Sequence, residues 1–302
     1  MLKKRKGDKG MIDMRSWEEI AAKNIRNRPS APGRLQGKIA VITGAAQGFG
    51  KGIAEEMHKE GACVVIADIN EPLAQQVVAA LGERAAAVQV NVAEEESVAR
   101  MVQKSVEIFG GIDIFINNAG IVRSGPLETL EKDDFDLVTN VNYTAYFLCV
   151  KYVSAIMKAQ SAADPQWTGD IIAINSKSGL VGSNKNFAYT GSKFGGVGLT
   201  QSFALELLPY HIKVNAVCPG NYLEGPLWSD PENGLFVQYF KAGKIPGAKS
   251  VEDVKRHYEN TSSPMKRGVL PIDVARAVFY CVEQQYETGQ AIPVTGGQIM
   301  LN

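Results

Sequence analysis

Three side chains near the middle of the chain have the types and spacing for acid–base chemistry. Tyr189 and Lys193 lie four residues apart in a segment of helical period, so they share one helix face, and Ser176 ends an apolar run 13 residues before Tyr189. A phenol titrates near pH ~10, but an adjacent ammonium favours the phenolate and lowers its pKa. Tyr189 would then exchange a proton with a substrate oxygen to which Ser176 is hydrogen-bonded. Each residue alone also has a purely structural explanation, because Tyr-x-x-x-Lys occurs by chance in many helices and a serine after a strand is commonly a cap.

A glycine-rich turn earlier in the chain indicates where a cofactor would bind. Residues 43–50 read Thr-Gly-Ala-Ala-Gln-Gly-Phe-Gly between an apolar run and a helical segment. Glycines let the backbone approach a pyrophosphate, and a helix N-terminus supplies N–H donors and a partial positive charge. The spacing Gly-x-x-x-Gly-x-Gly differs from the general dinucleotide fingerprint, but its position after a strand and before a helix strengthens it. The turn therefore predicts a dinucleotide site.

An acidic residue lies at the offset expected for the ribose of that dinucleotide. Asp68 ends the second apolar run, 18 residues after Gly50. Its carboxylate would accept hydrogen bonds from the ribose hydroxyls and repel a 2′-phosphate, and residues 45–47 and 69–70 include no Arg or Lys. These features favour NAD over NADP. The alternative role for Asp68 is a strand-end cap.

The elements that must position these residues follow a β-α alternation from residue 37 onward. Short apolar runs without alternation are typical of parallel strands covered on both faces, and the segments between them have helical period. Seven strands are predicted at 38–43, 62–68, 85–91, 112–117, 170–175, 212–217 and 290–294, with helices that include 50–60, 72–81, 95–109, 133–160 and 188–208. The predicted fold class is α/β, a doubly wound Rossmann fold with a seven-stranded parallel sheet and helices on both faces.

Two segments depart from this alternation. Residues 1–36 carry ten Lys and Arg against four Asp and Glu, and Ser16 followed by Glu19 predicts a capping box and a short helix over Ser16–Arg28. We expect this basic extension to pack on the domain or on a neighbouring subunit, with binding to a polyanion as the alternative. Residues 219–271 have weak periodicity and predict a substrate lid, or else a helical pair that only packs. Residues 37–302, which include this segment, form one predicted Rossmann-fold domain.

Composition excludes several other classes of protein. The chain of 302 residues has 32 basic and 32 acidic residues, so no overall field attracts nucleic acid or an anionic membrane. No apolar run approaches the ~20 residues that span a bilayer. The four cysteines and three histidines are scattered, so we expect no metal site, no disulfides and a cytoplasmic protein.

Together these motifs resemble the short-chain dehydrogenase/reductase family over residues 37–302. The resemblance rests on the turn at 43–50, Asn117-Asn118-Ala119-Gly120, Ser176, Tyr189-x-x-x-Lys193 and Pro219-Gly220. It implies a catalytic tetrad of Asn142, Ser176, Tyr189 and Lys193, in which Asn142 would hold a water near Lys193. It also implies that NAD contacts Gly44, Gln47, Gly48, Phe49, Gly50, Asp68, Ile69, Asn91, Val92, Asn118, Ala119, Gly120, Tyr189, Lys193, Pro219 and Gly220. The chain departs from the family at Asn91, where Asp is usual, and at Glu224, where a Thr often follows Pro-Gly.

Within the family, residues 174–179, 193–202 and 294–298 are similar to members that oxidise a polyol phosphate. This likeness implies a small-molecule substrate whose contacts are Ser176, Lys177 and Tyr189, with Lys177 beside the catalytic serine for the phosphate. Lys185, Lys266 and Arg267 could add positive charge, although each has the alternative role of a solvated surface cation.

Two other functional classes stay open. A relative acting on a free polyol, a hydroxy acid or a carrier-bound ketone would share every catalytic and cofactor residue. A non-enzymatic nucleotide sensor would have no need of Tyr189 and Lys193. By analogy with the family, we expect a homo-oligomer, a dimer or tetramer formed through the helices at 133–160 and 188–208.

Overall fold

The computed structural model describes residues 12–26, 28–260 and 264–300, and it confirms the predicted doubly wound sheet. Seven strands pair in parallel in the order β3-β2-β1-β4-β5-β6-β7. They are β1 (Ile39–Thr43), β2 (Cys63–Asp68), β3 (Ala85–Gln89), β4 (Ile114–Asn117), β5 (Gly169–Ile174), β6 (Ile212–Pro219) and β7 (Ala291–Val294). The order reverses between β1 and β4, the position at which ligands bind in open α/β sheets.

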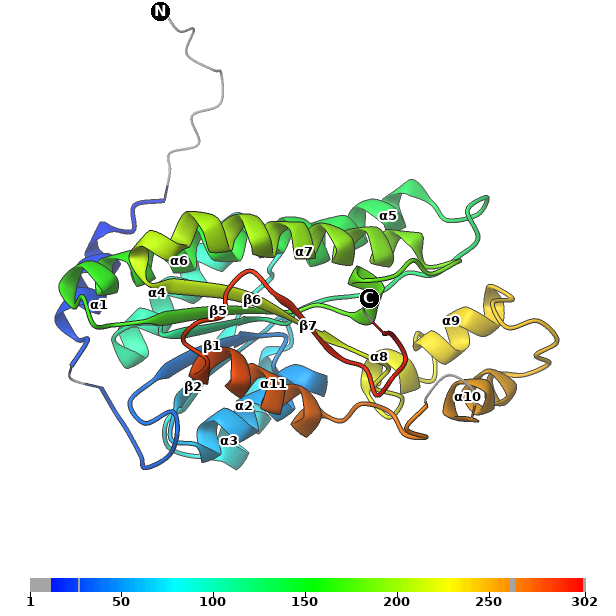
Figure 1. The fold of residues 1–302 in the computed structure, drawn as a ribbon, viewed down its shortest axis with the longest axis horizontal. Coiled ribbons are helices and arrows are strands. Elements are labelled where there is room, and N and C mark those ends of the chain that lie inside the picture. Colours follow the sequence, from blue (N-terminus) through cyan, green and yellow to red (C-terminus); the bar gives the residue numbers. More distant parts are fainter. Residues whose placement is uncertain (1–11, 27, 261–263, 301–302) are drawn as a thin grey trace, which may run out of the picture.

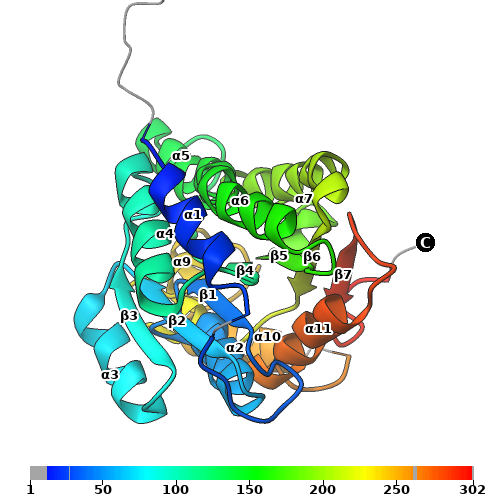
Figure 2. The same ribbon diagram turned by 90° about the vertical axis from the view of Figure 1, so that its left-hand side faces the viewer.

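Helices cover both faces of the sheet (Figures 1 and 2). One face carries α4 (Glu95–Phe109), α6 (Ala145–Ala163) and α7 (Phe187–Leu207), and the other carries α2 (Gly48–Lys59), α3 (Glu71–Leu81) and α11 (Pro271–Glu283). Each face has its own hydrophobic core. Two single turns of 3₁₀ helix, η2 (Lys177–Gly179) and η3 (Leu208–Tyr210), follow β5 and α7.

The helix predicted over 133–160 is present, but a π-helical turn interrupts its α-helical geometry. The segment divides into α5 (Lys132–Thr139), a π-helical turn η1 (Asn140–Thr144) and α6. Asn142 lies in the π turn, where its side chain accepts a hydrogen bond from Ile121 N and donates one to Ile121 O, both at 2.9 Å. This attachment to the segment after β4 accompanies the local widening of the helix, and such turns are frequent at functional sites.

The N-terminal helix also differs from its predicted bounds. Helix α1 spans Arg15–Lys23, its N-cap is Met14, and no side chain caps it, so the capping box predicted at Ser16 is wrong. Met14 supplies the carbonyl that accepts from the N–H groups of Trp17 and Glu18, each at 3.0 Å. The helix lies against α6 and α4 (Figure 2). The most basic part of the extension, residues 1–11, lies outside the described residues.

After α1 the chain crosses the amino edge of the sheet to its other face. Arg28 forms a buried ion pair with Asp113, whose second oxygen accepts a hydrogen bond from Trp167 Nε1 at 2.6 Å. Leu35 is then buried in the core beneath α2 and α11, and Arg34 pairs with Glu60 at 3.1 Å. The described part of the extension is therefore packed on the domain.

Three short helices lie beyond the carboxyl ends of the strands, where the lid was predicted (Figure 1). They are α8 (Pro226–Ser229), α9 (Leu235–Lys241) and α10 (Val251–Asn260). Trp228 contacts Phe236, Tyr239 and Tyr258 with ring centroids 4.7–5.7 Å apart, and these rings form a separate small core. Aromatic packing replaces the periodic pattern that a longer helix would show.

All four cysteines are free and buried. In the described part of the chain, no helix combines the length and apolarity needed to cross a membrane.

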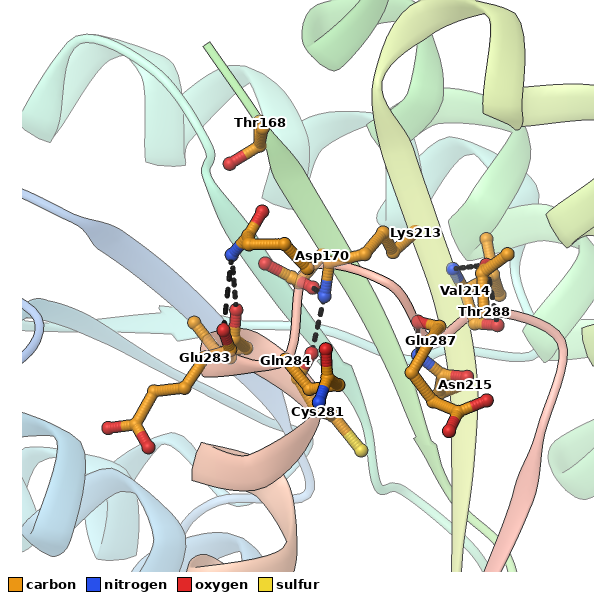
Figure 3. A network of polar contacts seen from close by, with 12 residues as sticks. Thr168, Asp170, Lys213, Val214, Asn215, Cys281, Glu283, Gln284, Glu287 and Thr288 are labelled. Carbon is orange, nitrogen blue, oxygen red and sulfur yellow. Dashed lines mark hydrogen bonds and ion pairs between the residues drawn. The ribbon is translucent and has the colours of Figure 1, made fainter.

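A buried polar network joins α11 to the amino ends of β5 and β6 (Figure 3). Lys213 Nζ donates to Asp170 Oδ1 at 2.6 Å and also to the carbonyl of Cys281 near the end of α11. Burial raises the pKa of Asp170 to about 6, and the Lys213 ammonium opposes that shift. Beside them Asn215 donates to Glu287 O and accepts from Gln290 N, each at 3.0 Å. These contacts place polar groups in the core, each with a partner.

Removing one member of this ion pair should destabilise the fold strongly. Asp170→Leu and Lys213→Met each leave a buried charge without its partner, so each should lower the free energy of unfolding by about 3–5 kcal/mol. The double variant removes both charges and should lie much closer to wild type. Urea denaturation gives the three values. Glu55→Gln breaks an exposed pair with Lys51 and should cost less than about 1 kcal/mol. Additive losses in the double variant would contradict the coupling.

Candidate active site

A cavity of about 620 Å³ opens at the carboxyl ends of the strands, between the sheet and the lid helices. Every residue predicted to contact NAD lines it except Gly50. The predicted substrate contacts Ser176, Lys177 and Tyr189 also line it. The structure thus brings to one cavity residues that are more than 170 positions apart in the sequence.

The glycine turn is shaped by its fold partners. Gly44 and Gly48 have φ values of +62° and +63°, which L side chains rarely adopt. Asn118 Nδ2 donates to Thr43 O at 2.8 Å and to Gly44 O at 2.9 Å, which ties the end of β4 to the end of β1. Gly50 is buried beneath the turn, where a Cβ would lie 2.4 Å from Gly44 O. Its role is therefore close packing of α2 on the turn.

Asp68 lies at the end of β2, and two backbone N–H groups hold its carboxylate in place. Its Oδ2 accepts from Ala46 N at 3.0 Å and its Oδ1 accepts from Asn70 N at 2.9 Å. Both oxygens keep lone pairs for further donors. Among the described residues lining this end, from Gly44 to Val92, none is Arg or Lys. A carboxylate without a neighbouring cation suits two ribose hydroxyls better than a 2′-phosphate.

The two departures from the family pattern have local explanations. Asn91 lines the cavity, but its amide donates to Glu94 Oε1 at 2.8 Å and accepts from Ala93 N at 3.2 Å. It therefore organises the start of α4. Glu224 lines a second hollow on the lid and not this cavity.

The cavity wall fits a dinucleotide with polar groups at both ends. Asn221 follows Pro219-Gly220, and its Nδ2 is a buried donor without a partner in the described part of the chain. A buried donor of this kind is normally satisfied, so a ligand amide or hydroxyl would complete it. Phe49 of the glycine turn stacks on Tyr222 with centroids 4.9 Å apart, which joins the turn to the start of the lid.

Tyr189, Lys193 and Ser176 meet at the end of β5. Lys193 is 8% exposed, and its Nζ donates to the carbonyl of Ile174, the last residue of β5, at 3.1 Å. The same Nζ lies 5.5 Å from the centroid of the Tyr189 ring. Ser176 Oγ accepts from Ser178 N at 3.0 Å in the turn that follows β5. One helix and one strand end therefore fix the predicted acid–base group.

Asn142 lies close to this group but uses its amide on the chain. Besides holding Ile121, its Nδ2 donates to Ser192 Oγ at 3.2 Å. A Cβ on Gly120 would lie 3.3 Å from Asn142 Oδ1 and 3.8 Å from Lys193 Nζ, so both side chains approach the same glycine. The predicted tetrad is thus gathered in space, with Asn142 positioned behind the cavity wall.

Burial, more than the lysine charge, sets the pKa values of the pair in the chain alone. Desolvation raises the pKa of the Tyr189 phenol to about 12, and the nearby Ser176 hydroxyl offsets this in part. Desolvation also lowers the pKa of Lys193 to about 8. The sequence predicted a lowered Tyr189 pKa, and the difference arises because the lid core packs against the Tyr189 ring and removes water from it. An additional positive charge beside the ring is needed to favour phenolate.

Of the cations predicted to bind the substrate, one lines the cavity and the others lie elsewhere. Lys177 lines the cavity. Lys185 donates to the carbonyls of Ala242 and Gly243 at 2.8 and 2.7 Å, so it fastens the lid. Lys266 and Arg267 line the second hollow. A further lysine, Lys244, was not predicted and lies in the cavity wall. Weak periodicity over residues 219–271 gave no signal for it.

Comparison with known proteins places these motifs in a wider context. The short chain dehydrogenase family model matches residues 38–229. Sorbitol-6-phosphate 2-dehydrogenase of Escherichia coli K12 is 36% identical over 270 residues, which cover 87% of this chain and 99% of that protein. Galactitol 2-dehydrogenase of Agrobacterium fabrum is 34% identical over 269 residues, 88% of this chain and 99% of that protein.

Solved structures resemble the fold closely. The crystal structure of sorbitol-6-phosphate 2-dehydrogenase SrlD from Erwinia amylovora has a TM-score of 0.77 and 37% identity, covering 87% of this chain and all of that one. The 3-ketoacyl-(acyl-carrier-protein) reductase from Brucella melitensis, solved in complex with NADH, has a TM-score of 0.74 and 30% identity, covering 88% of this chain and all of that one.

Charge at Asp68 should decide the choice between NAD and NADP. Asp68→Arg replaces a repelling carboxylate by a cation for the 2′-phosphate, so the ratio of kcat/KM with NAD to that with NADP should fall roughly 10²-fold. Asp68→Asn keeps the shape and removes the charge, and it should give an intermediate ratio. Steady-state kinetics with both cofactors measures this. An unchanged ratio in Asp68→Arg would count against the assigned role.

Proposed function

The chain belongs to the short-chain dehydrogenase family, and within that family we propose that it is an NAD-dependent oxidoreductase acting on carbon 2 of a polyol phosphate. The observation that carries this proposal is the meeting of Tyr189, Lys193 and Ser176 at the end of β5, in the wall of a cavity that also includes the glycine turn and Asp68.

Each of the three side chains has a separate role in the proposed reaction. In the oxidative direction Tyr189 accepts the proton of the secondary hydroxyl while Ser176 donates a hydrogen bond to the same oxygen. Lys193 stabilises the phenolate, because its buried ammonium lies 5.5 Å from the ring centroid. Bound NAD⁺ would supply the hydride acceptor and would add positive charge near the phenol. In the reverse direction Tyr189 would donate its proton to the carbonyl oxygen while the carbonyl carbon receives the hydride.

The preference for NAD rests on Asp68. Its carboxylate is ordered by two backbone N–H groups, and Asp68 is the one charged side chain among the described cavity-lining residues from Gly44 to Val92. The relative from Brucella melitensis, solved with NADH, supports the same choice.

The proposed substrate is sorbitol 6-phosphate, which would be oxidised to fructose 6-phosphate. Similarity to sorbitol-6-phosphate 2-dehydrogenases in both sequence and structure supports this proposal. Lys177 supports it independently, because it lines the cavity directly after the catalytic serine and can bind a phosphate oxygen. A free polyol is the second candidate, favoured by the similarity to galactitol 2-dehydrogenase.

Turnover of the two polyols should separate these candidates. The full chain with NAD should produce NADH from sorbitol 6-phosphate with a higher kcat/KM than from sorbitol, as measured by NADH absorbance. Tyr189→Phe keeps the ring and removes the proton acceptor, so it should lower kcat by about 10²–10⁴-fold. Full activity in Tyr189→Phe would contradict the mechanism, and a preference for free sorbitol would favour the second candidate.

We also propose that the chain forms a homo-oligomer through α6 and α7. These helices expose large apolar side chains, among them Phe147 at 48%, Phe194 at 46% and Leu205 at 78%. An exposed apolar face of this kind is typical of an interface.

Light scattering after size exclusion should therefore give a dimer or a tetramer. Leu205→Glu should lower that mass, because it places a charge in the buried interface. Leu127→Glu is the matched control, since Leu127 is 75% exposed in the turn before α5 and belongs to neither α6 nor α7, and it should leave the mass unchanged. A monomeric wild-type chain would refute the proposal.

A further inference from the structure

Two lysines from different elements line the same cavity on its substrate side. Lys177 comes from the turn after β5, next to Ser176, and its Nζ donates to Gln298 Oε1 at 2.8 Å. Lys244 comes from the lid, just after α9, and its Nζ donates to Ser183 Oγ at 3.0 Å. The Lys177 ammonium therefore reaches the cavity from the sheet, and the Lys244 ammonium reaches it from the lid.

Lys244 is linked to the catalytic tyrosine through an aromatic ring. Its Nζ lies 4.0 Å from the ring centroid of Tyr239, a buried lid residue. Tyr239 in turn lies close enough to Tyr189 for the two phenols to interact electrostatically. Lys244, Tyr239 and Tyr189 all line the same cavity, so a ligand there can contact the lid lysine and the catalytic tyrosine together.

Neither ammonium is neutralised within the described part of the chain, where no carboxylate lies within ion-pair distance of Lys177 or Lys244. Burial together with the positive charges of Lys177 and Lys185 lowers the pKa of Lys244 to about 8, and burial lowers the pKa of Lys177 to about 8. Two uncompensated cations that repel each other are costly to hold together, so an anion between them would stabilise both.

The other charged groups near the cavity are already engaged. Lys185 binds lid carbonyls, and Arg123 pairs with Asp134 at 3.2 Å. Asp230 is a carboxylate in the cavity wall, but its Oδ1 accepts from the backbone N–H groups of Glu232 and Asn233 at 3.0 and 2.6 Å. Among the described cavity-lining residues, Lys177 and Lys244 are the cations that pair with no carboxylate and donate to no backbone carbonyl.

We propose that Lys177 and Lys244 form an anion subsite that binds the phosphate monoester of the substrate between the catalytic turn and the lid. The inference rests on the proposed function and deepens it by naming Lys244 as a specificity-determining residue. A phosphate dianion matches two ammonium groups in charge, and its oxygens can accept from Lys177, Lys244 and the Ser183 hydroxyl together. A substrate bound in this way holds the lid against the sheet and places its carbon chain across Tyr189.

The direct test compares phosphorylated and free substrate in matched variants of the full chain. Lys244→Met and Lys177→Met should each lower kcat/KM for sorbitol 6-phosphate by roughly 10- to 100-fold, and should lower kcat/KM for sorbitol by a much smaller factor. Lys244→Arg should restore most of the loss. Lys241→Met removes the same charge from an exposed position at the end of α9 and should change neither value. Equal losses for both substrates, or no loss for either, would overturn the subsite.

A binding measurement separates failure of the subsite from failure of the proposed reaction. Inorganic phosphate is titrated by calorimetry into the full chain without added NAD. The wild type and Lys241→Met should bind phosphate, and Lys244→Met and Lys177→Met should bind it at least tenfold more weakly. If no polyol is turned over but this pattern is found, the proposed reaction is wrong and the subsite stands. Equal phosphate affinity in all four proteins, or no binding to the wild type, would refute the subsite.

Discussion

The active-site geometry depends on how Lys193 is held against the end of β5. Its ammonium is buried and donates to the carbonyl of Ile174, while Asn175 Nδ2 donates back to Lys193 O at 3.0 Å. This close approach of α7 needs glycines, because a Cβ on Gly196 would lie 2.9 Å from Asn175 Nδ2 and one on Gly179 would lie 2.9 Å from Lys193 O. One helical turn away, Tyr189 is partly buried and packs against the small core of the lid. The packing that aims the pair therefore also disfavours both of their charged forms, so that phenolate requires further positive charge.

Charged groups at the amino ends of the strands hold parts of the fold together, whereas charged groups at the carboxyl ends line the candidate site. At the amino edge, Arg28 with Asp113 and Lys213 with Asp170 form buried pairs that fasten the extension and α11 to the strands. At the carboxyl edge, charged groups such as Asp68 and Lys177 are anchored by neutral neighbours and keep capacity for a ligand. The amino-edge charges are paired with opposite charges within the fold, although Arg28 Nε and Nη2 have no hydrogen-bond partner among the described residues. The charges at the carboxyl edge retain donors and acceptors that a ligand can use.

Local sequence patterns predicted most of the fold and the centre of the site. Apolar runs identified all seven strands, and the glycine turn, Asp68 and Tyr189 with Lys193 fall in one cavity. The failures involve contacts distant in sequence or elements without periodicity. The π turn at Asn142 depends on Ile121, 21 positions earlier, and Lys244 lies in a lid held by aromatic packing. The raised Tyr189 pKa was missed because spacing shows the neighbouring charge and not the depth of burial.

We expect the positive charge of bound NAD⁺ to convert the partly buried phenol of Tyr189 into a base. Ultraviolet titration of the wild type minus Tyr189→Phe isolates the phenolate absorbance of this one tyrosine, with NAD⁺, with NADH and with neither. The Tyr189 phenol should titrate near pH 12 in the chain alone and in the NADH complex. NAD⁺ should displace this midpoint to a clearly lower pH. The same midpoint with and without NAD⁺ would contradict it.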